Sequence, residues 1–290
     1  MIIFLANQFV GSTVSSGGDV LFTQILGKVK TPSTVLVPKI IAPSFISKFP
    51  KVKVVLTDNS KRFKSASSVM GGVITMFQYF SRALNSFIWL SKNVHANDTI
   101  YLTGDFICNS FPAWSIKLFK PKLNVIANFY HRNPLPSQRM GNNYLVSFFS
   151  RLLQSISLLL IKSSSSTVFV LGREGKQELL RLGFAPSKII ISGAGIDDKL
   201  ISKYSKNIKI DNQFIYIGRI NITKGAFDLV TILKMFDDQY SEWHCHFIGQ
   251  GTERDKQLLK DMAQKQSISN KITIHGYLGE DEKYQLLASS

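Results

Sequence analysis

Two cations stand where an apolar run gives way to a helical pattern in the stretch FIYIGRINITKGAFDLV, residues 214–230. Arg219 and Lys224 flank the start of the predicted helix, near Gly225. A cation at a helix N-terminus opposes the helix dipole, whereas a bound anion would reverse that penalty. A planar guanidinium and a compact ammonium together suit a diphosphate. The spacing therefore predicts a diphosphate site, with two solvated loop side chains as the alternative.

Two further turns between predicted strands and helices carry glycines. Gly17 and Gly18 precede a helical pattern that starts at Val20, for which Asp19 is the predicted N-cap, and Gly249 follows the run HCHFI. Glycine lets the backbone approach a ligand closely or adopt positive φ, and ligands of open α/β sheets bind beyond the carboxyl ends of strands. The first turn lacks the G-x-G-x-x-G fingerprint, so ordinary turns without a ligand stay open as the alternative.

Histidines and one aspartate are the other candidates for chemistry. His131 follows the predicted strand NVIANFY, and the residues alone favour a loop histidine there. Asp105, in LTGDFICNS, ends another predicted strand and either meets a ligand or caps its own loop. His244, His246 and His275 are interpreted as structural, because no further ligand follows at a metal spacing, and no metal site is expected.

The elements that position these residues alternate in type along the chain. Short apolar runs are separated by longer amphipathic segments, which is typical of βαβ units and predicts α/β architecture with parallel sheets. The pattern restarts after the polar segment 196–213. We therefore expect two Rossmann-like domains, residues 1–200 and 201–290. The second has only the strands FIYIGR, WHCHFIG and KITIHG, so it is expected to be incomplete.

Bulk composition fits two globular domains and a basic surface. The 290 residues are 44% hydrophobic and 19% charged, with a net charge of +16. This charge predicts attraction to polyanions, and nucleic acid is not expected because no RNP, zinc-finger or homeodomain pattern occurs. Two cysteines and no secretory leader pattern favour the cytoplasm.

The longest apolar run, residues 144–161, contains Arg151 and Gln154 at its centre. An arginine at the bilayer midplane costs about 2.5–3.5 kcal/mol, so the run is not expected to span a membrane. It is either a core helix or a helix lying on a membrane. The second reading predicts peripheral contact with the anionic inner face of a membrane.

Six segments in this order and spacing resemble glycosyltransferase family 4, enzymes of the two-domain GT-B architecture that use nucleotide-sugar donors. The resemblance covers nearly the whole chain. The segments are the Gly17-Gly18 turn, FYHRNP at 129–134, VFVLGREGKQELLRLGFAPSKIIISGAGID at 168–197, YIGRINITKG at 216–225, FIGQGTERDKQL at 247–258 and ITIHGYLGEDEKYQLLASS at 272–290.

The resemblance implies roles for the candidate residues. Arg219 and Lys224 would hold the donor diphosphate and offset charge on the departing nucleoside diphosphate, and the amides near Gly17 and Gly18 would lie close to the phosphates and the reacting sugar. His131 would contact the transferred sugar.

It also assigns Gly249 to the donor site and places Gly276 and Tyr277 near the nucleotide base. The family retains the anomeric configuration and needs no metal or other cofactor, the nucleotide sugar being a co-substrate. The implied acceptor is a surface-polysaccharide or lipid-linked glycan, as in polysaccharide or lipopolysaccharide biosynthesis.

One departure from the family pattern lies at the C-terminal end. The family carries a pair of glutamates, separated by seven residues, beyond the point that corresponds to Ser290, so a truncated or fragmentary sequence is expected. The alternative to a glycosyltransferase is then a non-catalytic module that binds a nucleotide sugar or a membrane surface.

Overall fold

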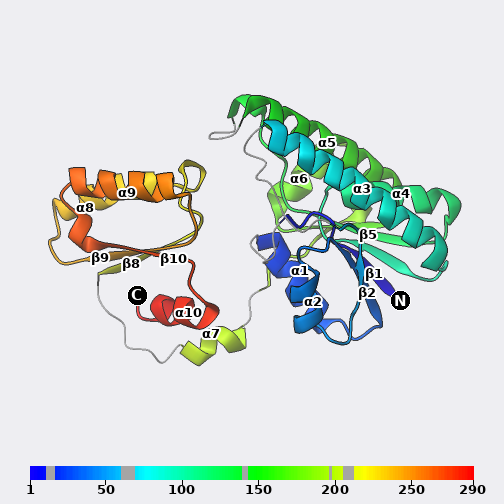
Figure 1. Ribbon diagram of the computed structural model, residues 1–290, viewed down its shortest axis with the longest axis horizontal. Helices are drawn as coiled ribbons and strands as arrows, with labels where there is room; N and C mark the ends of the chain where they lie inside the picture. Colours follow the sequence, from blue (N-terminus) through cyan, green and yellow to red (C-terminus); the bar gives the residue numbers. More distant parts are fainter. Residues whose placement is uncertain (11–16, 60–68, 139–142, 196–197, 205–211) are drawn as a thin grey trace. The chain divides into compact units, whose positions relative to one another are not determined.

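Two compact units, Met1–Gly195 (unit 1) and Ile196–Ser290 (unit 2), make up the computed structural model (Figure 1). It describes residues 1–10, 17–59, 69–138, 143–195, 198–204 and 212–290. The domain boundary predicted at residue 200 falls inside the helix α7 (Asp198–Tyr204). Each unit has its own parallel sheet, which confirms the predicted α/β class.

Seven parallel strands form the sheet of unit 1, in the order β3-β2-β1-β4-β5-β6-β7. The strands are β1 (Ile2–Leu5), β2 (Ser33–Val37), β3 (Lys53–Leu56), β4 (Thr99–Leu102), β5 (Asn124–Phe129), β6 (Thr167–Val170) and β7 (Ile189–Ile191). β1 pairs with both β2 and β4, so the direction in which strands are added reverses between β1 and β4. Such a reversal is where open α/β sheets bind ligands.

Helices cover both faces of this sheet, which explains why most positions in its strands are apolar. The helices of unit 1 are α1 (Gly17–Lys28), α2 (Ala42–Lys48), α3 (Val69–Asn93), α4 (Ile107–Phe119), α5 (Tyr144–Ser164) and α6 (Arg173–Arg181). Ile3 and Leu5 of β1 face the core with α3, α4 and α5, while Phe4 faces the core with α1 and α2. α1 begins at Gly17 and not at Val20, so the predicted N-cap Asp19 lies in its first turn.

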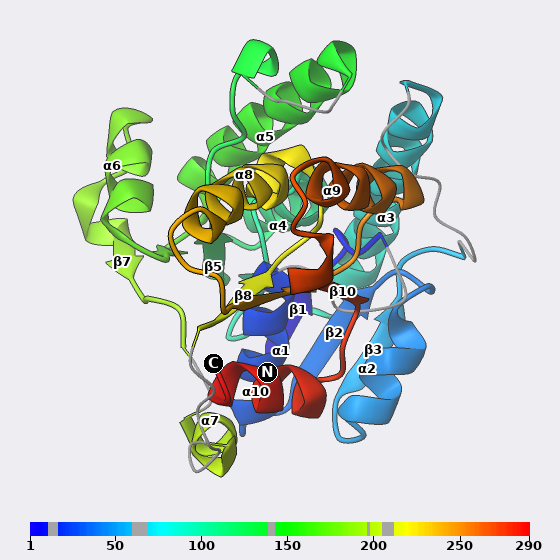
Figure 2. The same cartoon turned by 90° about the vertical axis from the view of Figure 1, so that its left-hand side faces the viewer.

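Unit 2 has three parallel strands in the order β10-β9-β8. The strands are β8 (Gln213–Ile217), β9 (His244–Ile248) and β10 (Ile272–Gly276), and the helices are α7, α8 (Ala226–Asp237), α9 (Glu253–Lys265) and α10 (Glu280–Ala288). α8 and α9 cover one face of the sheet and share its core, and α10 lies on the other side (Figures 1 and 2). The three strands predicted for this part of the chain are confirmed.

Candidate functional site

The carboxyl edge of the unit 2 sheet carries the two cations. Arg219 follows the end of β8, and Lys224 ends a short 3-10 turn directly before Gly225 and α8. Both side chains are exposed, and neither forms a hydrogen bond or ion pair with another described residue. They are therefore available to a ligand.

The backbone that carries these cations is held firmly. The Tyr216 hydroxyl lies 2.8 Å from the carbonyl oxygen of Arg219 and 3.2 Å from that of Lys224, so it ties both ends of the segment together. Ile220, between them, is fully buried, and its amide donates to the Gln250 carbonyl at 2.9 Å. Burial raises the pKa of Tyr216, which keeps its hydroxyl protonated as a donor. The backbone of residues 219–224 is therefore fixed, while the side chains of Arg219 and Lys224 extend from it without partners among the described residues.

Gly249 and Gly276 occupy the ends of the two neighbouring strands. At Gly249, φ is 149°, and a Cβ there would lie 1.8 Å from the Gly218 carbonyl oxygen. The amide of Gly249 donates to the Gly276 carbonyl at 2.7 Å, and Gly276 has a φ of 74°. Close packing of the strand ends thus requires glycine at position 249, whereas at position 276 the left-handed backbone favours it. Tyr277, just beyond, is 73% exposed.

The corresponding edge of unit 1 carries Gly17 and Gly18. A Cβ on Gly18 would lie 2.8 Å from the ring of Tyr130, whereas nothing lies within 4 Å of one on Gly17. The Tyr130 hydroxyl lies 3.2 Å from the Gly18 carbonyl oxygen and 2.9 Å from that of Thr103, at the end of β4. Tyr130 therefore joins the start of α1 to the strand ends at the point where the sheet order reverses. Residues 11–16 of the predicted glycine turn lie outside the described residues.

His131 follows Tyr130 at the end of β5 and is exposed. Its carbonyl oxygen accepts from Nε2 of Gln154 on α5 at 2.8 Å, and Oε1 of Gln154 accepts from the Asn133 amide at 2.8 Å. The same Nε2 donates to the Asp105 carboxylate at 2.7 Å. Burial raises the pKa of Asp105 to about 6, against the opposing effect of the Gln154 hydrogen bond. Gln154 thus fixes the backbone around His131 relative to β4.

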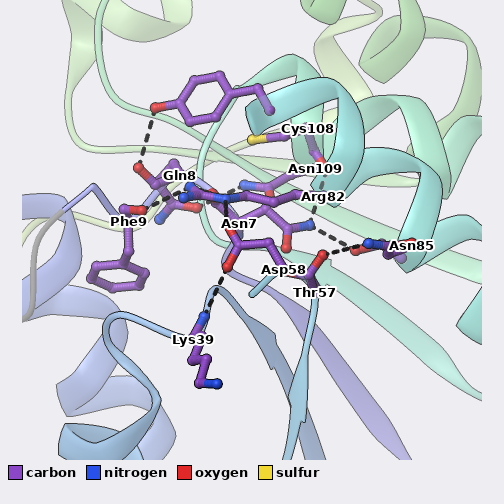
Figure 3. A network of polar contacts seen from close by, with 12 residues as sticks. Asn7, Gln8, Phe9, Lys39, Thr57, Asp58, Arg82, Asn85, Cys108 and Asn109 are labelled. Carbon is purple, nitrogen blue, oxygen red and sulfur yellow. Dashed lines mark hydrogen bonds and ion pairs between the residues drawn. The ribbon is translucent and has the colours of Figure 1, made fainter. Parts of the chain in front are cut away.

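A buried polar network supports the segment after β1 (Figure 3). Arg82 of α3 is 1% exposed, and its Nε donates to Asp58 at 2.6 Å. Its Nη1 donates to the carbonyl oxygens of Asn7 and Phe9, both at 2.8 Å. The Tyr79 hydroxyl donates to the Gln8 carbonyl at 3.2 Å, so three successive carbonyls are held by α3. This network shapes the chain that leads from β1 toward Gly17.

The structure thus gathers the predicted residues into two sets, one for each unit. Arg219, Lys224, Gly249, Gly276 and Tyr277 share the carboxyl edge of the unit 2 sheet, because carboxyl ends of parallel strands meet at one edge. A second set, made of Gly17, Gly18 and His131, lies at the carboxyl edge of the unit 1 sheet.

Sequence reasoning missed four residues that organise these edges. Nothing in the sequence around Tyr130 and Tyr216 indicates their roles, apart from their positions in or just after a predicted strand. Arg132, beside His131, donates from Nη2 to the Ser155 hydroxyl of α5 at 2.8 Å. Gln154 could have been found as a polar residue that breaks a long apolar run.

Comparison with known families finds one match, and it falls on unit 2. Residues 198–290 match the family described as Glycosyl transferases group 1. This segment contains both cations and the two strand-end glycines. No curated protein matches the chain.

Solved structures extend the likeness to the whole chain. Anabaena Alr3699/HepE in complex with UDP-glucose has a TM-score of 0.66 at 13% identity, covering 99% of this chain and 71% of that one. The lipopolysaccharide outer core galactosyltransferase WaaB has a TM-score of 0.59 at 11% identity, with coverages of 97% and 69%. The Candida albicans trehalose-6-phosphate phosphatase N-terminal domain has a TM-score of 0.66 at 10% identity, with coverages of 99% of this chain and 74% of that one. At these identities the likeness establishes the fold, which is that of GT-B glycosyltransferases.

Proposed function

We propose that the protein is a retaining glycosyltransferase that moves a sugar from a nucleoside-diphosphate sugar to a surface-polysaccharide or lipid-linked glycan acceptor. The observation that carries this proposal is the pair Arg219 and Lys224. Both are exposed and unpaired among the described residues, on a backbone that Tyr216 and Ile220 hold rigid, inside the segment that matches Glycosyl transferases group 1.

The two cations would bind the donor diphosphate at the start of α8. The first amides of a helix lack intrahelical acceptors and, with the helix dipole, favour an anion there. Gly276 and Tyr277 would border the nucleotide base, with the ring of Tyr277 exposed for stacking. Gly249, whose absent side chain keeps the strand ends close together, would line the same donor site.

In the proposed transfer, the bond between the anomeric carbon and the donor phosphate oxygen breaks, and its electron pair leaves with the nucleoside diphosphate. Arg219 and Lys224 stabilise the charge that develops there, which is electrostatic catalysis by groups already in position. The acceptor oxygen bonds to the anomeric carbon on the same face, and its proton passes to the departing phosphate oxygen. His131 would contact the transferred sugar, with the amides of Gly17 and Gly18 near the phosphates. No cofactor takes part in this scheme.

Donor binding by calorimetry tests the proposal. Arg219→Ala and Lys224→Ala should each weaken binding of UDP-glucose or another nucleotide sugar by about 1.5–3 kcal/mol, the range for hydrogen bonds to charged groups. Lys265→Ala is the matched control. Lys265 is an exposed lysine at the C-terminal end of α9, whereas the donor site is proposed at the carboxyl edge of the sheet, where α9 begins. Unchanged donor affinity in both variants would reject the assignment, and transfer of labelled sugar to a glycan acceptor would test turnover.

A second proposal, peripheral contact with an anionic membrane, comes from two apolar helix faces. α3 exposes Phe77 and Phe80, each 67% exposed, and α5 exposes Phe149 at 50% and Leu159 at 64%. A Cβ on Gly72 of α3 would lie 3.2 Å from Val146 of α5, so the first turns of these helices are neighbours. Among the described residues, α5 alone is long and apolar enough to cross a membrane by length and composition. With a net charge of +16, such faces suit the surface of an anionic bilayer.

Vesicle sedimentation tests the membrane contact. The chain should sediment with anionic vesicles, less so as salt rises, and Phe77→Ser with Phe80→Ser should reduce the bound fraction. Phe119→Ser changes a phenylalanine on α4 that is 74% exposed, and it serves as the control. Equal binding to neutral and anionic vesicles, or no effect of the paired substitution, would contradict the proposal. Sedimentation without any donor turnover would favour the non-catalytic binding module.

A further inference from the structure

Helix α5 holds the segment that carries His131 by its backbone. The carbonyl oxygen of His131 accepts from Nε2 of Gln154 at 2.8 Å, and the amide of Asn133 donates to Oε1 of the same side chain at 2.8 Å. The imidazole itself is exposed and forms no hydrogen bond with another described residue. One side chain of α5 therefore fixes the peptide group that follows His131 and the next one, and leaves the imidazole available to a ligand.

Asp105 determines which way the Gln154 amide is oriented. Gln154 is 8% exposed and Asp105 is 7% exposed, so both side chains depend on partners within the protein. Nε2 of Gln154 has two N–H groups, and their partners are the Asp105 carboxylate at 2.7 Å and the His131 carbonyl. A reversed amide would set its oxygen against both of these oxygens and its NH₂ group against the N–H of Asn133. The three partners thus permit a single orientation.

A link that only joined α5 to the strand ends would not need a buried carboxylate. Ser157, less than one turn further along α5, donates to Ser110 of α4 at 2.7 Å, and these two buried hydroxyls form an uncharged link. Burial raises the pKa of Asp105 to about 6, so its ionised form is unfavourable there. Ionisable groups with shifted pKa values gather at functional sites. The charged partner of Gln154 lies at the carboxyl edge of the sheet, where ligands of α/β folds bind.

We propose that Gln154, oriented by Asp105, is a positioning residue that holds the backbone after His131 so that the imidazole is in place for the transferred sugar. This role rests on the proposed function, in which His131 contacts that sugar. A misplacement of about 1 Å in a group that contacts the reacting molecule lowers the rate by up to about a hundredfold. Loss of the Gln154 contacts should therefore lower kcat. Donor binding, which is proposed to depend on Arg219 and Lys224, should stay unchanged.

Gln154→Glu tests the two donors with a side chain of nearly the same shape. A carboxyl has at most one donor in place of two, so it cannot serve both Asp105 and the His131 carbonyl, whereas its other oxygen still accepts from the Asn133 amide. The kcat for transfer of labelled sugar should fall by about tenfold to a hundredfold, with the calorimetric Kd for the nucleotide sugar unchanged. Gln24→Glu makes the same change at an exposed position of α1 and should alter neither value.

Two comparisons separate positioning from a general loss of stability. Ser157→Ala removes the buried hydrogen bond between α5 and α4, so it should lower the stability of unit 1 in urea unfolding while kcat stays at the wild-type value. Asp105→Ala leaves Nε2 of Gln154 without the acceptor that orients it and should lower kcat, whereas Asp105→Asn keeps an oxygen there and should lower it less. A kcat that falls in proportion to lost stability in every variant, or an Asp105→Asn as slow as Asp105→Ala, would overturn the positioning role.

Amide signals of the ¹⁵N-labelled chain give a readout that does not depend on turnover. Gln154→Met removes the acceptor of the Asn133 amide, so this amide should exchange its hydrogen with solvent faster. Gln154→Glu should shift the amide signal of Arg132, which shares a peptide group with the His131 carbonyl. Ser157→Ala should leave both the exchange rate and the shift at their wild-type values.

These measurements keep the positioning role apart from the proposed function. A wild-type chain that transfers sugar with a kcat that Gln154→Glu leaves unchanged would overturn the positioning role and keep the glycosyltransferase. A wild-type chain that binds no nucleotide sugar would reject the proposed function. The amide signals then decide alone: changes at residues 131–133 in the Gln154 variants would support Gln154 as the residue that fixes this segment, and wild-type signals there would overturn it.

Discussion

Replacing Arg82 by methionine removes the cation at the centre of the buried network of unit 1 (Figure 3). The change keeps a long side chain but leaves the carboxylate of Asp58, itself buried with Arg82, without its ion pair at 2.6 Å. The carbonyls of Asn7 and Phe9 also each lose a donor at 2.8 Å. Removing one partner of a buried pair costs about 3–5 kcal/mol, and each unsatisfied carbonyl adds to this. We expect Arg82→Met to lower the free energy of unfolding of unit 1 by at least about 3 kcal/mol.

Urea unfolding followed by tryptophan fluorescence measures this cost in the correct unit. The chain has three tryptophans, so in a Trp243→Phe background Trp89 and Trp114 report unit 1. Asp58→Asn combined with Arg82→Met removes both charges, and its cost should fall short of the sum of the single costs by about 1–3 kcal/mol. Additive costs, or a loss below about 1 kcal/mol for Arg82→Met, would refute the view that this ion pair holds the segment after β1.

Three further predictions concern the stability of each unit and rest on single residues. Gly249→Ala should destabilise unit 2 by more than about 2 kcal/mol, because its Cβ would meet the Gly218 carbonyl oxygen at 1.8 Å, and a wild-type melting temperature would contradict this. Burial and two neighbouring histidines lower the pKa of His246. The unfolded state therefore binds a proton that the folded state does not, so unit 2 should lose stability as pH falls below about 6.5, and His246→Gln should flatten this dependence in urea unfolding. Burial raises the pKa of Asp105 from 3.8 to about 6, so unit 1 should lose stability as pH rises between these values. Asp105→Asn should then be more stable than wild type at about pH 7.5 and lose that advantage below about pH 4, and a less stable variant at neutral pH would reject the assignment.

The strands could be predicted from the sequence because of how parallel sheets are buried. Helices cover both faces of the unit 1 sheet, so a strand such as β1 (Ile2–Leu5) is apolar at every position. Some of these runs end at a polar residue where the chain leaves the sheet, as at Thr57 after β3 and Thr103 after β4. Helix starts were less certain, since α1 begins at Gly17 without the predicted cap. A helix start is fixed by local backbone geometry that several residues can satisfy.

The candidate site was predictable only in part, because its framework is made by contacts between distant segments. Gly249 was recognised as a turn glycine, but the sequence does not reveal that its missing side chain lets the backbone pack against Gly218. Gln154 joins the ends of β4 and β5 from a helix that reads as apolar. Arg132 donates to Ser155 on α5, which lies 23 residues away along the chain. Spacing along the chain carries none of this information.

The two units differ in whether a cationic side chain is exposed or is buried as part of the framework at the carboxyl edge of the sheet. In unit 2, the charged side chains of Arg219 and Lys224 are free, and the polar groups that hold them, above all the Tyr216 hydroxyl, bind only backbone. In unit 1, a cation is itself the framework, since Arg82 spends its donors on Asp58 and on the carbonyls of the segment after β1. A buried cation whose donors are already bonded to the protein cannot also bind a ligand without breaking those bonds, whereas an exposed cation on a rigid backbone can bind one without reorganising the fold.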